Sequence, residues 1–172
     1  MSPRFKVAGI FLVCAAPFIL GWLAYEFRWG AGSAANYGEL IAPRALAGPL
    51  TPLRGKWVLV TLDAAPCGAA CERKLYTVRQ LRRAQGKDAG RIERLWLITD
   101  GGKPAPPLVT ALEDSRIAPA GADLIAAFPG DPLAHIYLVD PLGNLMMRFP
   151  PDPEPLKVIK DLQRLLKYSR FG

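Results

Sequence analysis

The hydropathy pattern separates a long apolar run near the N-terminus from a later region of short apolar runs. Residues 7–25 are 19 consecutive uncharged, mostly apolar residues, and at about 1.5 Å per residue a helix of this length nearly spans a bilayer core of about 30 Å. Arg4 and Lys6 precede the run, so the positive-inside rule places residues 1–6 in the cytoplasm. We therefore predict a single uncleaved membrane anchor over residues 7–27, with the rest of the chain outside the cytoplasm. The alternative is a cleaved signal peptide, whose apolar region is usually shorter, about 7 to 15 residues.

Residues 28–52 are rich in Gly, Ala and Pro and show no sustained period. We interpret them as a tether and lead-in, with room for a short edge hairpin, to one domain over residues 53–169.

The first half of this domain predicts a strand, a helix and a second strand. Residues 57–62 are apolar almost without a break, as expected of a central strand that is covered on both faces. A helix over about residues 70–85 places Cys71, Leu75, Val78 and Leu81 on one stripe. A second apolar strand follows at 95–98. Strand, helix and strand in this order imply a right-handed parallel crossover.

The second half predicts short helices near 108–112 and 122–128, a hairpin formed by 135–139 and 145–149, and a last helix. Asp152 is a candidate N-cap for that helix, and Leu156, Ile159, Leu162 and Leu166 are its expected core stripe. The fold class is therefore α/β, and the element order is that of a thioredoxin-like domain preceded by a single N-terminal transmembrane helix.

Composition narrows the possible functions. The 172 residues are 51% apolar and 22% charged, with a net charge of +7. Because no basic stripe is interleaved with aromatic residues, we do not expect nucleic-acid binding. The chain has three cysteines, too few for a disulfide scaffold, and only Cys67 and Cys71 lie close together. One close pair indicates redox or metal chemistry.

Cys67 and Cys71 fall at the predicted strand-to-helix turn, where a helix N-terminus stabilises a thiolate. A spacing of four places both sulfurs on the same side of the first helical turn, within reach of a disulfide. Two thiolates with one imidazole would suit Cu(I) and keep Cu(II) accessible. Copper binding, thiol redox exchange and a purely structural disulfide all remain open at this point.

The sequence resembles the Sco/SenC family of membrane-anchored cytochrome c oxidase assembly proteins. The resemblance is carried by residues 55–60 leading into Cys67 and Cys71, by His135 shortly before a strand, and by Leu-Val-Asp-Pro-x-Gly at 138–143. The family usually has Pro after the first cysteine, whereas this loop is Gly-Ala-Ala at 68–70. The chain is therefore similar to a divergent member.

The resemblance implies a thioredoxin-like fold that binds one copper ion, Cu(I) or Cu(II), through Cys67, Cys71 and His135. His135 is the only histidine of the chain, and its alternative role is purely structural. Asp100 would orient one of the metal ligands without binding the metal itself, or accept a proton; alternatively, it simply ends a strand. Pro132 would correspond to the cis-proline of thioredoxin-like folds, although a trans proline in a turn is the commoner case.

The function expected from these features is a copper-binding or thiol-redox assembly factor for the copper site of a respiratory oxidase, more a metallochaperone than an enzyme. Its partners would be oxidase subunit II or another copper or thiol carrier, and membrane lipid through residues 7–27. It would lie in the inner membrane as a single-pass protein with its domain on the periplasmic side. The alternatives are a membrane-anchored thiol–disulfide oxidoreductase without copper, with Cys67 and Cys71 as its catalytic pair, and a non-catalytic assembly protein.

Overall fold

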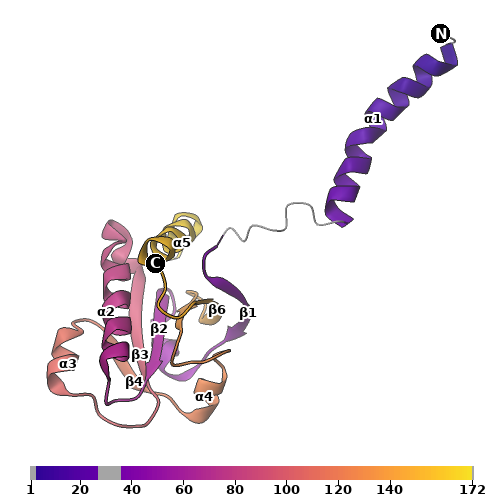
Figure 1. Ribbon diagram of the computed structural model, residues 1–172. Helices are drawn as coiled ribbons and strands as arrows, with labels where there is room; N and C mark the ends of the chain where they lie inside the picture. The colour runs from indigo at the N-terminus through magenta and orange to yellow at the C-terminus, as the bar shows by residue number, and fades with distance from the viewer. Residues whose placement is uncertain (1–2, 27–35, 172) are drawn as a thin grey trace. The chain divides into compact units, whose positions relative to one another are not determined.

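The computed structural model describes residues 3–26 and 36–171, which belong to two compact units. One unit holds helix α1 (Pro3–Glu26), and the other begins at Asn36 (Figure 1). Among the described residues, no helix has both the length and the apolarity that crossing a membrane requires. The anchor predicted over residues 7–27 is therefore not confirmed. Its last residue, and residues 28–35 of the predicted tether, lie outside the described part.

The second unit is built on one six-stranded sheet in the order β1-β6-β5-β2-β3-β4. The strands are β1 (Glu39–Ala45), β2 (Trp57–Asp63), β3 (Ile92–Ile98), β4 (Arg116–Pro119), β5 (Ile136–Val139) and β6 (Asn144–Phe149). The β2–β3 and β3–β4 pairs are parallel, and the other three pairs are antiparallel. The α-helices of this unit are α2 (Ala69–Arg83), α3 (Pro106–Ala111), α4 (Ala122–Ala126) and α5 (Pro155–Tyr168), with 3-10 helices η1 (Gly48–Leu53) and η2 (Gly86–Arg91).

The β2–α2–β3 crossover is confirmed, with β2 and β3 paired in parallel along their whole length. Helix α2 buries Cys71, Leu75, Val78 and Leu81, which is the predicted stripe. Because β2 is paired on both sides and buried from Trp57 to Leu62, its carboxyl end is held in a fixed place. That end leads directly into the cysteine loop.

The two faces of the sheet have separate cores. Leu59, Ile136 and Leu138 pack with residues of α2 and α5, which lie side by side on one face (Figure 1). Val60 and Tyr137 belong to the opposite face, which is covered by residues of η1 and by Phe128 just after α4. The faces alternate along each strand as the pleat requires. This alternation decides which side chains reach the cysteine loop.

Three predicted features differ from the structure, and one strand was not predicted at all. The lead-in forms an edge strand, β1, paired with β6, and not a hairpin of its own; a second edge strand, β4, was not predicted. Helix α5 begins at Pro155 after Glu154, and not at Asp152. Its buried residues are Val158, Asp161, Leu162 and Leu166, while Leu156 is 74% exposed. The prediction included Leu156 in the core stripe because it started the helix too early, at Asp152. In the structure Leu156 lies in the first turn of α5 and faces solvent.

Candidate functional site

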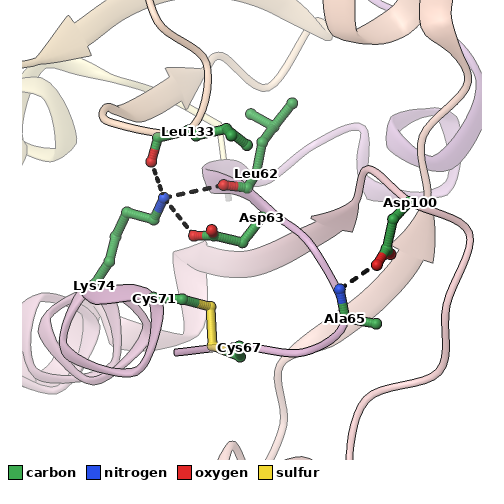
Figure 2. Close-up of a disulfide and its surroundings, with 8 residues drawn as sticks. All are labelled: Leu62, Asp63, Ala65, Cys67, Cys71, Lys74, Asp100 and Leu133. Carbon is green, nitrogen blue, oxygen red and sulfur yellow. Dashed lines mark hydrogen bonds and ion pairs between the residues drawn. A yellow bond between two sulfur atoms is a disulfide. The ribbon is translucent and has the colours of Figure 1, made fainter. Parts of the chain in front are cut away.

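A disulfide joins Cys67 and Cys71 in the loop between β2 and α2 (Figure 2). Their Cα atoms are 5.3 Å apart, which is ordinary disulfide spacing. Cys71 lies in the first turn of α2 and is only 5% exposed, whereas Cys67 precedes the helix and is half-buried. Gly68 is the N-cap and provides no side-chain hydrogen bond. The N–H groups of the first turn are therefore not capped by a side chain and favour negative charge beside the sulfurs.

Asp100 holds the start of this loop. Its Oδ1 accepts hydrogen bonds from the N–H groups of Ala65 and Gly102, both at 3.0 Å. These two bonds hold the pKa of the Asp100 carboxyl below its usual value, and the bond from Ala65 has the larger effect. The carboxylate thus acts on the backbone two residues before Cys67.

A partly buried ion pair lies on the other side of the disulfide. The Lys74 ammonium is 2.6 Å from Asp63 Oδ2, donates to the Leu62 carbonyl at 3.0 Å, and also donates to the Leu133 carbonyl (Figure 2). The Lys74 and Asp63 side chains are only 11% and 21% exposed. One ammonium group therefore ties together the end of β2, the first turns of α2 and the segment before β5.

Cys71, Asp63 and Lys74 all line one cavity of about 300 Å³, and Leu133 and Ala134, in the segment before β5, also line it. Neither charged residue was among the site residues predicted from the sequence. Two signals were available: Asp63 is the first charged residue after the apolar run, and Lys74 follows Cys71 by three, on the same helix face. The cavity gives the buried sulfur a polar neighbourhood with both an acid and a base.

His135 lies on the other face of the sheet. Its Nδ1 is 2.7 Å from the carbonyl oxygen of Phe149, and its ring contacts Tyr137 at a centroid distance of 6.0 Å. Tyr137 belongs to the core cluster away from α2, whereas Cys71 packs on the α2 side with Trp96. No peptide bond among the described residues is cis, so Pro132 is trans. The structure thus brings Cys67 and Cys71 together, and does not bring His135 to them.

The residues as arranged do not fit a three-ligand copper site. Both sulfurs are joined to each other, and the His135 ring lies on the face of the sheet opposite to Cys71. Within residues 3–26 and 36–171, no group of three or more His, Cys, Asp or Glu side chains is placed to hold a metal ion. What the arrangement does provide is a disulfide between one buried cysteine, Cys71, and one half-buried cysteine, Cys67.

Comparisons with known proteins agree with this fold. Residues 57–169 match the family model described as "Transmembrane-like, thioredoxin-like, C-terminal domain". No curated protein matches the chain.

Among solved structures, ScoI of Bradyrhizobium japonicum with copper bound is 22% identical, with 74% of this chain and 98% of that chain covered and a TM-score of 0.52. Yeast Sco1 with copper bound is 13% identical over 78% and 90%, with a TM-score of 0.56. The thioredoxin domain of a thiol-disulfide oxidoreductase from Bacteroides vulgatus is 18% identical over 78% and 99%, with a TM-score of 0.50. The expected likeness to Sco proteins is confirmed in the fold.

Proposed function

The chain belongs to the family of transmembrane-like, thioredoxin-like C-terminal domains, and on that premise we propose that it is a thiol–disulfide redox protein. One observation carries the proposal. The two cysteines form a disulfide at the start of α2, with Cys71 buried and Cys67 partly accessible. A thiolate from outside should therefore reach Cys67 more readily than Cys71.

In its reduced form the pair would reduce a partner disulfide. The Cys67 thiolate attacks one partner sulfur, and the other partner sulfur leaves as a thiolate with the electron pair of the broken bond. The Cys71 thiolate then attacks Cys67, which restores the disulfide and releases the partner as a dithiol. Two electrons pass to the partner, and a reduced thiol carrier must supply two in turn. The first-turn N–H groups and the Lys74 ammonium stabilise the thiolate of Cys71 before it attacks.

The proposal is tested with the reduced full chain and glutathione disulfide as the model oxidant. Cys67→Ser should abolish exchange, whereas Cys71→Ser should stop after the first step and accumulate a mixed disulfide with glutathione. All variants carry Cys14→Ser as well, because Cys14 is a free, exposed thiol that would itself exchange with glutathione disulfide. His135→Ala should exchange at the same rate as this reference chain, because its ring lies on the opposite face of the sheet from Cys71. Thiol exchange of equal rate in Cys67→Ser would reject the proposal.

Copper binding by the reduced pair is a second candidate function. It is supported by the likeness in fold to two Sco structures that have copper bound. We propose one copper ion per chain, lost in both Cys67→Ser and Cys71→Ser. Ligation by His135 would require the segment before β5 to rearrange, because its ring lies on the opposite face from Cys71.

An anaerobic Cu(I) titration of the reduced full chain tests this candidate. His135→Ala asks whether the imidazole is a ligand, and Ala134→His places an imidazole on the cavity that contains Cys71. If His135→Ala retains wild-type affinity while Ala134→His raises it, the site is built on the α2 face of the sheet. Absence of stoichiometric binding by the reduced wild-type chain would reject copper.

The partner and the location are also part of the proposal. The resemblance to the Sco/SenC family supports oxidase subunit II, or another copper or thiol carrier, as the partner that receives electrons or copper. The family description and the sequence of residues 1–27 support association with the inner membrane and a periplasmic domain. Fusion of alkaline phosphatase after residue 172 tests the location, since the enzyme is active only outside the cytoplasm.

A further inference from the structure

An exposed apolar surface surrounds the C-terminal end of α5. It includes a cavity of about 410 Å³ whose lining includes Trp57, Leu142, Met146, Leu165, Tyr168 and Phe171. Three of these side chains are well exposed: Leu142 at 59%, Tyr168 at 76% and Phe171 at 49%. We call this the α5-end surface. Neither the disulfide nor any residue of the cysteine loop contributes to it.

The backbone of this surface is held in place by side chains from the body of the domain. The Arg91 guanidinium donates to the carbonyl groups of Leu166, Ser169 and Phe171. The indole N–H of Trp57 donates to Ser169 Oγ at 3.3 Å. The aromatic side chains at positions 168 and 171 therefore project from a segment whose position is fixed, and their exposure is a built feature of the domain.

Positive charge borders the apolar residues. A second cavity, of about 440 Å³, also includes Ser169 and is lined by Lys87, Arg91 and Lys167. Within the described part of the chain, Lys87, Lys167 and Arg170 form no ion pair.

The acidic groups at this end already have partners in the domain. Asp88 pairs with Arg91, and Asp140 accepts hydrogen bonds from the N–H groups of Leu142 and Asn144. The side chains that line the two cavities include four cations, Lys87, Arg91, Arg164 and Lys167, and two carboxylates, Asp88 and Asp140, so their net charge is positive.

We propose that the α5-end surface docks on an anionic lipid bilayer. Exposed aromatic and leucine side chains beside uncompensated lysine and arginine are what a membrane interface binds, with the apolar groups at the acyl boundary and the cations at the lipid phosphates. Trp57 begins β2 and the disulfide follows its other end, roughly 20 Å away along seven residues. Docking at Trp57 therefore leaves the disulfide at the far end of β2 from the membrane, open to a partner.

Vesicle co-sedimentation tests the proposal on residues 36–172, which contain the whole sheet and all three buried clusters and so form a complete domain without α1. The vesicles are phosphatidylcholine alone, or phosphatidylcholine with about one third phosphatidylglycerol. Binding should require the anionic lipid. Lys167→Gln and Arg170→Gln should each weaken it about fivefold, and Leu142→Ser should weaken it about tenfold.

Two matched controls lie away from this surface. Leu156→Ser removes a leucine of similar exposure, 74%, from the opposite end of α5, and Lys103→Gln removes an exposed charge near the cysteine loop. Both should bind like the wild type. Equal losses in control and test variants, or no binding to anionic vesicles, would overturn the proposal. A concentration-dependent dimer that Leu142→Ser dissolves would overturn it in favour of a second copy of the chain.

Discussion

The sharpest test of the site concerns the Lys74 ammonium, and Lys74→Met removes it while keeping most of the side-chain volume. Lys74 joins three points: the Asp63 carboxylate at 2.6 Å, the Leu62 carbonyl at 3.0 Å and the Leu133 carbonyl. The variant leaves Asp63, only 21% exposed, without its cation. It should therefore lose more stability than a surface substitution does.

The loss can be estimated from these contacts. A hydrogen bond to a charged group contributes about 1.5 to 3 kcal/mol, and removing one member of a buried pair costs about 3 to 5 kcal/mol. Both side chains retain some solvent contact, which lowers the estimate, and the methionine recovers part of the packing. We expect Lys74→Met to reduce the free energy of unfolding by about 3 kcal/mol. The double variant with Asp63→Asn should show a coupling energy of about 2 kcal/mol.

The assay is urea unfolding of the oxidised protein, followed by circular dichroism. Arg73→Met is the matched control, because Arg73 precedes Lys74, lines the same cavity, is exposed and forms no ion pair with another described residue. It should change stability by less than about 0.5 kcal/mol. If Lys74→Met falls within that range of Arg73→Met, the ion pair does not hold the site together.

The same variant has a redox readout that a merely structural role would not move. An ammonium beside the cavity of Cys71 stabilises the thiolate and so favours the reduced pair. Without it the disulfide should be harder to reduce, with a reduction potential about 20 mV more negative. Equilibration with glutathione buffers measures this value. No shift, or a shift to more positive potential, would show that the ammonium does not stabilise the thiolate of Cys71.

Three further predictions address the framework. Asp161→Ala removes two 2.8 Å hydrogen bonds to backbone N–H groups at the start of the domain and should cost about 2 kcal/mol in chemical unfolding, whereas exposed Gln163→Ala should cost under about 0.5. Asp100 has a lowered pKa, so its stabilisation of the loop is present above its unfolded value of 3.8 and is lost as pH falls further; in acid titration, Asp100→Asn should abolish this pH-dependent part. Gly143→Ala, at φ +91°, should lower the thermal midpoint through about 1 kcal/mol of backbone strain.

The central unit of the fold was predictable because its signals are local. The β2–α2–β3 crossover follows from two apolar runs around one amphipathic helix, and each of these patterns lies within about 15 residues of sequence. The hairpin of β5 and β6 follows from the Pro/Gly turn between them. The disulfide partners also lie within a single turn. For these elements the sequence neighbours are also the spatial neighbours.

The edge strands were not predictable for the opposite reason. Strand β1 is exposed at six of its seven positions and contains Pro43, and β4 is four residues long and ends in Pro119. Neither strand has the alternation or the apolarity that marks a strand in sequence. Both are strands because β6 and β3 offer them unpaired backbone groups. Such pairing depends on the assembled sheet, which no local window contains.

The position of His135 shows why a ligand set is harder to predict than a fold. In a strand, neighbouring side chains point to opposite faces, so a shift of one residue decides whether an imidazole faces α2. Two neighbouring residues show which face each position takes. Ile136 is buried on the face covered by α2 and α5, and Tyr137 is buried on the opposite face. His135 therefore shares the face of Tyr137, and Ala134 is the residue that reaches the cavity of Cys71. Spacing along the chain placed a histidine near the right strand, but only the packing of its two neighbours determines which face it takes.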